Sequence, residues 1–259
     1  MKKAVGLSLI YALTLYAAEA ELGTIDVEAK TDTEVIKDVH GEDIKSADLA
    51  EALFKKSPSV SIVRRSGVAN DIIVRGQKKD NISVTIDGAK VCGACPNRMD
   101  PPVSHILTNN IDYIQIDEGP FDVENFGVLS ADVKIHTIKP SKTLQGDLNL
   151  GLGSFGYKKG AFSLSGGTDT VRLLLTSSAE KSDQYEDGNG DDFVGQIARN
   201  IALGKAPEAA QYQPRYQDMK AYTKKTLMGK LFWDIAENHE VRLSYTANRS
   251  DDVLYPSSK

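Results

Sequence analysis

The second half of the chain alternates strictly between apolar and polar residues from about Thr143 onward, and no other feature restricts the fold as much. Successive side chains of a β-strand point to opposite faces, so this alternation places apolar residues on one face and polar residues on the other. The pattern recurs in five segments, whose apolar positions are Leu144, Leu148, Leu150 and Leu152; Phe162 and Leu164; Val171, Leu173 and Leu175; Leu227, Leu231 and Trp233; Val241, Leu243 and Tyr245. The sequence therefore predicts five antiparallel strands with one apolar face each.

The segments between these strands alternate in length. Residues 166–169 and 237–240 predict tight turns, whereas residues 182–219 form a long polar connection. Short turns at one end and long loops at the other are typical of a transmembrane β-barrel, with apolar side chains toward lipid. A water-soluble sandwich with one wet face is the alternative. Because single-chain barrels have about eight strands or more and open edges are not tolerated in lipid, we expect residues 141–259 to be the N-terminal part of a barrel that is incomplete in this chain.

The N-terminus predicts a secretory signal peptide over residues 1–20. Lys2 and Lys3 precede an almost wholly apolar stretch, which ends at a small-x-small cleavage site at residues 18–20. This stretch is shorter than the roughly 20 residues that a membrane-spanning helix needs. The net charge of -5 provides no basic surface for nucleic acid, so no nucleic-acid partner is expected.

Residues 21–140 lack the strict alternation and predict a small α+β domain. A helix is expected from a cap at Ser46 to about Lys56, with a buried face formed by Leu49, Leu53 and Phe54. Short runs rich in β-branched residues follow at residues 60–63, 72–75, 82–86, 111–116 and 133–138. Asp87-Gly88 and Gly119-Pro120 predict turns between them.

Both cysteines of the chain lie within residues 91–102, together with Met99. Thiolate and thioether sulfurs are soft ligands that select Cu(I), and zinc rarely accepts methionine. Cys95 and Met99 are four residues apart, so one helical turn starting at Pro96 would place both sulfurs on the same side. This spacing indicates half of a soft-metal site, whose other ligands must come from elsewhere in the protein.

Other interpretations of these residues remain open. Cys92 and Cys95 form a C-x-x-C, which is also typical of a structural disulfide or of the redox pair of a thiol oxidoreductase. His105 is a candidate third metal ligand or a structural histidine. Residues 187–192 resemble the first half of an EF-hand loop but lack its required glycine and glutamate, which favours a solvated loop. Nucleophile-elbow, P-loop and zinc-protease motifs are absent from the sequence, so an enzyme is not expected.

The order of signal peptide, α+β domain and barrel strands resembles that of the TonB-dependent outer-membrane receptors. Residues 72–76 and 81–88 resemble the R-G and V-x-I-D-G strands of the family's plug domain, and residues 114–120 and 133–140 resemble its later strands. The segment that resembles a TonB box, which pairs with TonB by strand addition, consists of Thr24, Ile25, Asp26 and Val27. The resemblance implies a plug domain over residues 21–140 inside a barrel of about 22 strands.

The same resemblance implies location and partners. Such a receptor lies in the outer membrane of a Gram-negative bacterium, contacts outer-membrane lipid, and is energised by TonB with its inner-membrane complex. Residues 93–102 are moreover similar to the plug loop of copper receptors of the NosA and OprC type. This implies transport of a copper ion, expected as Cu(I), or of a copper complex.

In that group of receptors, a Cys-x-x-x-Met half-site on the plug, here Cys95 and Met99, is completed by a His-x-Met pair from the barrel. The present sequence contains no His-x-Met, which agrees with an incomplete barrel. Cys92 departs from the group's pattern and is either an additional ligand or a disulfide partner. Two alternatives therefore stay open: a siderophore or haem receptor with a structural disulfide between Cys92 and Cys95, and a secreted thiol oxidoreductase.

Overall fold

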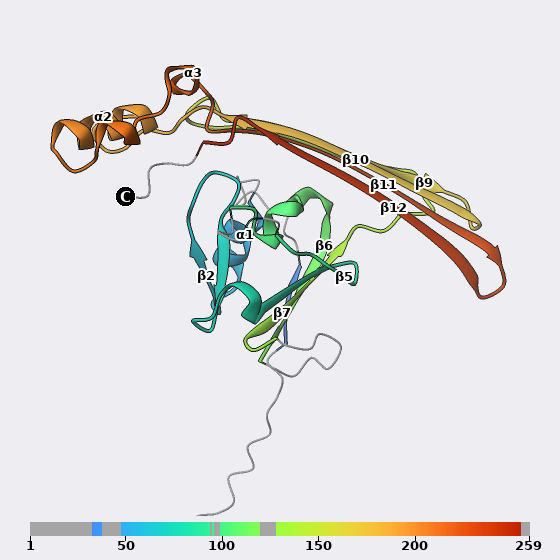
Figure 1. Ribbon diagram of the computed structural model, residues 1–259. Coiled ribbons are helices and arrows are strands. Elements are labelled where there is room, and N and C mark those ends of the chain that lie inside the picture. Colours follow the sequence, from blue (N-terminus) through green and yellow to red (C-terminus); the bar gives the residue numbers. More distant parts are fainter. Residues whose placement is uncertain (1–32, 38–47, 94, 96–98, 120–127, 255–259) are drawn as a thin grey trace, which may run out of the picture. The chain divides into compact units, whose positions relative to one another are not determined.

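A computed structural model describes residues 33–37, 48–93, 95, 99–119 and 128–254 of the chain. These residues belong to one compact unit and contain two five-stranded sheets and a two-stranded ribbon (Figure 1). None of the helices in these ranges is long and apolar enough to cross a membrane. The expected signal peptide at residues 1–20 and the expected TonB box at residues 24–27 lie outside the described residues.

The first sheet contains, in spatial order, β1 (Thr33–Lys37), β6 (Ile111–Glu118), β7 (Ala131–Thr137), β4 (Ile82–Ile86) and β5 (Ala89–Lys90). Strands β4 and β7 are parallel, and the other neighbours are antiparallel. Helix α1 (Leu49–Lys56) and the ribbon of β2 (Val60–Val63) and β3 (Asp71–Val74) contribute to the same apolar core. The predicted strands of this part are thus present, each within two residues of its expected bounds, and β1 and the short β5 are additional strands that were not predicted.

Helix α1 begins at a different cap from the expected Ser46. Asp48 is the N-cap: one carboxylate oxygen accepts the N–H of Ala50 at 3.0 Å and the other accepts the N–H of Asn70 at 3.0 Å. Burial raises the pKa of Asp48 to about 6, although both hydrogen bonds act in the opposite direction. Phe54, expected on the buried face, is 42% exposed and instead lies under the guanidinium of Arg64, at 5.4 Å from the ring centre.

The second sheet contains the five predicted strands, and all neighbours are antiparallel. They are β8 (Gln145–Leu152), β9 (Lys158–Gly167), β10 (Val171–Ser182), β11 (Tyr222–Ala236) and β12 (His239–Asp251). The two predicted tight turns are confirmed, at residues 168–170 and 237–238. Asn238 has φ 64°, a left-handed conformation that asparagine tolerates better than most residues.

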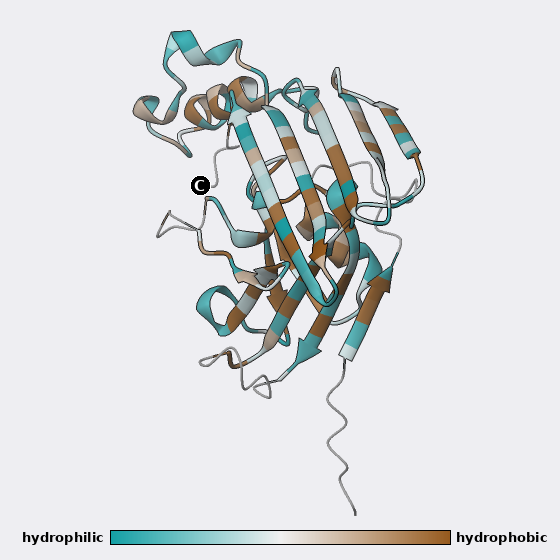
Figure 2. Cartoon of the chain, turned by 90° about the vertical axis from the view of Figure 1, so that its right-hand side faces the viewer, coloured by the Kyte–Doolittle hydropathy of each residue, from teal (hydrophilic) through white to brown (hydrophobic). Residues whose placement is uncertain are grey.

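The two faces of the second sheet have opposite character, as the alternation predicted (Figure 2). Leu148, Leu150 and Leu243 are 69%, 74% and 58% exposed on what we call the outward face. The other face is buried against the first part of the chain, and it carries Lys224 and Lys230 among its buried residues. A soluble protein buries its apolar face and exposes its polar one, so this arrangement contradicts the sandwich alternative and fits a sheet that faces lipid.

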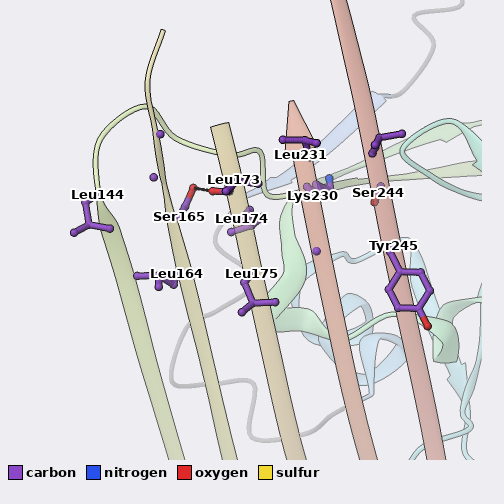
Figure 3. A pocket seen from close by; sticks show the side chains of 14 residues that line it. Leu144, Leu164, Ser165, Leu173, Leu174, Leu175, Lys230, Leu231, Ser244 and Tyr245 are labelled. Atoms are coloured by element: carbon purple, nitrogen blue, oxygen red, sulfur yellow. Dashed lines mark hydrogen bonds between the residues drawn. The ribbon is translucent and has the colours of Figure 1, made fainter. Parts of the chain in front are cut away.

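The outward face also carries an apolar groove of about 730 Å³ (Figure 3). Its lining includes Leu164, Leu175 and Tyr245, together with the glycines Gly166 and Gly229. Gly229 is paired with Leu175 on one side and Tyr245 on the other, so the absence of a side chain there leaves the hollow between two large residues. The groove is a feature of the lipid-facing surface and does not lie at the polar face.

The long connection between β10 and β11 is not the open polar loop that the sequence predicted. It contains α2 (Phe193–Ala202), a 3₁₀ turn at Glu208–Ala210 and α3 (Pro214–Gln217). Phe193 is buried and packs edge-on against Tyr185, with ring centres 4.5 Å apart. This apolar anchor explains why the segment folds despite its polar composition.

The carboxylates of the acidic run at residues 187–192 are paired within the protein itself. Asp187 accepts the backbone N–H groups of Asn189 and Asp191 and pairs with the guanidinium of Arg199, which also contacts Asp191 at 2.6 Å. The hydrogen bond from Arg199 lowers the pKa of Asp187 to about 2. The guanidinium of Arg199 therefore occupies the space between Asp187 and Asp191 in which a bound cation would lie.

The turn at Asp87-Gly88 joins the two sheets through a buried lysine. Asp87 accepts hydrogen bonds from the backbone N–H of Thr137 at 2.9 Å, from the Thr137 hydroxyl at 2.5 Å, and from Lys230 Nζ of β11 at 2.9 Å. Burial raises the pKa of Asp87, but the hydrogen bonds from Lys230 and Thr137 together outweigh burial and lower this pKa below its ordinary value. Asp87 is therefore a carboxylate that the folded state holds ionised.

Replacing Asp87 with asparagine is expected to lower the free energy of unfolding at neutral pH by about 2 kcal/mol, because buried Lys230 loses its anionic partner. This figure is below that of a fully buried pair because the Asp87 side chain is 40% exposed. The folded pKa lies below the unfolded one, so the stabilisation is fully present above the ordinary value of 3.8 and is lost as the pH falls through the folded pKa. Thermal unfolding of both proteins should thus show a constant difference from about pH 7 to 5 that shrinks below about pH 4. A difference that stays constant throughout the acid range would contradict the ionic role.

Candidate metal-binding loop

The sulfur-rich segment forms a loop between β5 and the 3₁₀ helix η2 (Pro102–His105). Cys92 is exposed, Cys95 is partly buried and Met99 is 45% exposed. Both cysteines are free thiols, so the structure contains no disulfide between them. The helical turn predicted between Cys95 and Met99 falls on residues 96–98, which lie outside the described residues.

Asp100 closes this loop on itself. Its carboxylate oxygen Oδ1 accepts the backbone N–H of Cys95 at 2.8 Å. On the other side of the loop, a Cβ atom added to Gly93 would lie 2.5 Å from the carbonyl oxygen of Asp100. This is closer than Cβ atoms in proteins come to any such atom. Glycine is therefore required at position 93 for this close approach. Asp100 and Gly93 together fix the backbone that carries the Cys95 thiol.

This clamp was not found by sequence reasoning. A short carboxylate next to a pair of prolines is a signal for a local side-chain-to-backbone hydrogen bond, since aspartate readily accepts main-chain N–H groups. The sequence could not show which N–H it accepts, because an aspartate carboxylate can accept any of several main-chain N–H groups near it in the chain. The hydrogen bond from the Cys95 N–H answers that question.

The loop presents two soft donors but does not complete a metal site with the described residues alone. Within the ranges that the structure describes, no three His, Cys, Asp or Glu side chains gather closely enough to hold a metal ion. A metal ion held by a thiolate at Cys95 and a thioether at Met99 would therefore need at least one further donor from outside this loop.

His105, the other candidate ligand, ends η2 and is held through its backbone. Its carbonyl oxygen accepts a hydrogen bond from the Asn248 amide of β12 at 2.6 Å. The ring atom Nε2 is buried and has no hydrogen-bond partner among the described residues. The ring does not join the two cysteines in a cluster, so a ligand role for His105 stays a prediction. By contrast, the His136 ring stacks on Tyr113, with ring centres 4.2 Å apart, as expected for a structural histidine.

The segment that follows the loop is fastened to the second sheet by a buried lysine. Lys224 Nζ donates to the carbonyl oxygen of Ser104 at 2.9 Å. Lys224 is directly opposite Glu180 in the β10–β11 register, and both side chains are buried. Glu180 Oε2 lies 3.5 Å from the Tyr157 hydroxyl, and its Oε1 is buried without a hydrogen-bond partner among the described residues. Glu180 is thus flanked by two lysines, Lys224 of β11 on one side and Lys159 of β9, its partner in the β9–β10 register, on the other.

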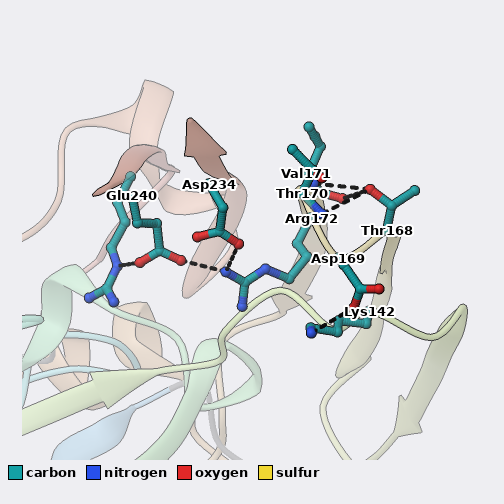
Figure 4. A network of polar contacts seen from close by, with 9 residues as sticks. Lys142, Thr168, Asp169, Thr170, Val171, Arg172, Asp234 and Glu240 are labelled. Carbon is teal, nitrogen blue, oxygen red and sulfur yellow. Dashed lines mark hydrogen bonds and ion pairs between the residues drawn. The ribbon is translucent and has the colours of Figure 1, made fainter. Parts of the chain in front are cut away.

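A second polar network lies at the end of the sheet with the tight turns (Figure 4). Arg172 pairs with Asp234 at 3.1 Å and with Glu240 at 2.5 Å, and Arg242 also contacts Glu240. The ring of Phe232 lies within 5.6 Å of the Arg172 guanidinium and 5.1 Å of the Arg242 guanidinium. These contacts join β10, β11 and β12 and have a structural role.

Alanine at Asp100 or Gly93 is expected to weaken metal binding by the loop without removing a sulfur. Loss of an outer-shell partner typically costs about 10- to 100-fold in metal affinity, so we expect a decrease of about tenfold for each variant. The measurement is the Cu(I) affinity of the reduced protein. Asp112→Ala, which removes an exposed carboxylate from β6, is the matched control and should bind like wild type. Unchanged affinity in both loop variants would show that the clamp does not position Cys95.

Comparisons with known proteins agree with the fold described above. Residues 26–128 match the family model of the TonB-dependent receptor plug domain. The heme transporters BhuA of Brucella ovis and Brucella abortus are each 26% identical over 180 residues, covering 64% of this chain and 26% of theirs. The chain thus spans about a quarter of the length of these curated relatives.

Two solved structures extend the likeness to the second sheet. The copper transporter OprC superposes with a TM-score of 0.67 at 22% identity, over 84% of this chain and 30% of that one. The siderophore receptor PirA from Acinetobacter baumannii superposes with a TM-score of 0.61 at 15% identity, over 84% of this chain and 31% of that one. At these identities the likeness shows the fold, and the predicted order of a plug domain followed by antiparallel barrel strands is confirmed.

Proposed function

This chain belongs to the TonB-dependent outer-membrane receptors, and from that membership we propose that it takes up copper through the loop from Cys92 to Asp100. The observation that supports the proposal is the clamp between Gly93 and Asp100, which holds the backbone of a free cysteine that precedes an exposed methionine by four residues. Copper is the cargo in this proposal, with Cu(I) or a Cu(I) complex as the bound species. A thiolate and a thioether favour Cu(I) over the harder Fe(III) of siderophore complexes.

Transport follows the family's general scheme in the proposal. The Cys95 thiolate and the Met99 thioether bind the ion, and donors outside the described residues complete its coordination. TonB then pairs with the segment at residues 24–27 by strand addition and pulls on the plug. Rearrangement of the plug releases the ion toward the periplasm.

A second candidate is uptake of haem or of a ferric siderophore. The similarity to the heme transporter BhuA favours it, since that match covers 64% of this chain. In that case Cys92 and Cys95 would serve as a disulfide or as ordinary loop residues. The third hypothesis, a secreted thiol oxidoreductase, is wrong, because the family consists of transport receptors.

The two candidates differ in what the purified receptor binds. The experiment titrates the reduced receptor with Cu(I) in competition with a chromophoric Cu(I) chelator, and separately with haem and with a ferric siderophore. The proposal expects one Cu(I) per chain and no stoichiometric binding of haem or siderophore. Stoichiometric haem or siderophore binding without Cu(I) binding would instead support the second candidate.

Proline at Ile25 or Val27 is expected to abolish uptake while leaving ligand binding intact. Strand addition depends on main-chain hydrogen bonds, and proline removes a donor. The conservative variants Ile25→Val and Val27→Ile keep that donor and serve as controls. Uptake of radioactive copper by cells and Cu(I) binding by the purified receptor are measured side by side. Wild-type uptake in both proline variants would exclude residues 24–27 from energy coupling.

A further inference from the structure

The outward face of the second sheet carries four cationic side chains close together, at the end of the strands nearest the long β10–β11 connection. Lys158 of β9 is paired with Lys181 of β10, and Lys225 of β11 is paired with Arg249 of β12. Lys225 is also paired with Ala179, two residues before Lys181. The four residues therefore occupy two adjacent rows across four neighbouring strands, and we call them the basic patch.

The strand periodicity places the basic patch on the apolar face. Lys225 shares its face with Leu227 and Trp233, whereas Lys224 belongs to the buried polar face. Arg249 likewise shares its face with Leu243 and Tyr245. The patch therefore borders the same lipid-facing surface that carries the exposed leucines.

The arrangement is unfavourable for the isolated protein. Like charges directly opposite in an antiparallel pair are destabilising, and the patch contains two such pairs. Of the four patch residues, Arg249 forms an ion pair with Asp251 at 2.9 Å, and Lys158, Lys181 and Lys225 form none with the residues that the structure describes. Asp251 and Asp183 are the acidic residues nearest to the patch in register on this face, so the positive charge remains in excess. An external anion would remove this repulsion.

The depth of the basic patch matches the outer border of the membrane. Trp233 lies near the tight-turn end of the sheet, where an aromatic girdle marks the inner interface of a barrel. Lys225 precedes it by eight residues, or about 27 Å along the strand at about 3.4 Å per residue. At a strand tilt of about 40° this is about 20 Å along the membrane normal, within an apolar band of about 25 Å. The backbone of the patch therefore lies about 5 Å below the outer edge of this band, a distance that extended lysine and arginine side chains span to reach the outer-leaflet headgroups.

We propose that the basic patch binds the phosphorylated headgroup of an outer-leaflet glycolipid. Phosphate oxygens accept charge-assisted hydrogen bonds from lysine, and arginine can bind them with two parallel bonds. Two cation pairs side by side suit a headgroup that carries two phosphates. The acyl chains of such a lipid would cover the apolar side chains directly below, including Leu227 and Phe162. The proposal depends on the membrane location of the sheet and not on the identity of the transported cargo.

The test compares double variants of the receptor in bilayer discs made of a zwitterionic phospholipid. Lys158→Gln/Lys181→Gln and Lys225→Gln/Arg249→Gln each remove one cation pair. Lys205→Gln/Arg215→Gln removes the same charge from exposed positions in the β10–β11 connection and is the matched control. The probes are bisphosphorylated lipid A, the same lipid without its phosphates, phosphatidylglycerol and inorganic phosphate. Bound lipid is counted by native mass spectrometry, and affinity is measured with a fluorescent lipid A.

Wild type and control are expected to bind bisphosphorylated lipid A alike, and each patch variant to bind it about tenfold more weakly or worse, since each charge contributes about fivefold near a membrane surface. Removing the phosphates from the lipid should weaken its binding to wild type by a similar factor. Equal binding of lipid A by the patch variants, or equal binding of the dephosphorylated lipid by wild type, would overturn the proposal. Phosphatidylglycerol binding as tightly as lipid A, or full competition by inorganic phosphate, would also overturn it, because the occupant would then not be a glycolipid.

Discussion

Replacing Cys95 with serine is expected to lower the Cu(I) affinity of the reduced receptor by at least about a hundredfold. Loss of an outer-shell partner already costs about 10- to 100-fold, and a thiolate ligand contributes more than such a partner. Met99→Leu removes a neutral thioether of similar volume and should cost about tenfold. The measurement is copper stoichiometry and affinity, by competition with a Cu(I) chelator, on reduced and on oxidised protein.

Two variants serve as controls for this prediction. Met219→Leu removes a methionine from the β10–β11 connection and should bind copper like wild type. Cys92→Ser distinguishes two roles: an effect close to that of Cys95→Ser would make Cys92 a ligand, and no effect would make it a bystander. A reduced wild-type receptor that binds no copper, with cysteines that form a disulfide whenever oxidant is present, would contradict the copper proposal and favour the haem or siderophore candidate.

Replacing Lys224 with methionine is expected to lower the free energy of unfolding by about 3 kcal/mol. The change leaves the Ser104 carbonyl oxygen without its donor and removes one of the two lysines that are opposite buried Glu180, so that Lys159 remains as the other. A buried carboxylate that loses part of its compensating charge is destabilising, so the double variant Glu180→Met/Lys224→Met should regain part of the loss. Thermal and denaturant unfolding in detergent measure the three proteins.

Lys225→Met is the matched control for this series, because it removes a lysine from the next position of the same strand on the exposed face. Its stability in detergent should differ from wild type by about 0.5 kcal/mol or less. Lys224→Met as stable as this control, or a double variant as unstable as the single one, would contradict the role of Lys224 as the partner of a buried carboxylate. Cu(I) affinity should change little in either variant, since the lysine contacts the segment after the loop and not the sulfurs.

Several features of the fold followed from the sequence because they depend on local order alone. The period-two alternation identified all five strands of the second sheet and the face on which Leu148, Leu150 and Leu243 are exposed. The Asp87-Gly88 turn was equally predictable, since both residues adopt positive φ, of 49° and 84°, which this pair tolerates. The sulfur loop itself was found for the same reason: donor type and spacing are properties of a short stretch of chain.

Other features required the tertiary structure because they depend on what lies opposite a residue in space. Strand β1 was missed because only its pairing with β6 makes it a strand, and Phe54 was misplaced because Arg64 offers it a partner at the surface. The hydrogen bond from the Cys95 N–H to Asp100 depends in the same way on the path of the loop.

The alternation of β11 places Lys224 and Lys230 on the polar face of the second sheet, but it carries no information on how deeply each one is buried. That depth is decided by the segments packed against the polar face, where Ser104 and Asp87 provide the partners. Sequence periodicity therefore determined which face each side chain occupies. Only the packing of distant segments decided which charged side chains are desolvated and which protein groups are their hydrogen-bond partners, because desolvation depends on neighbours in space rather than in sequence.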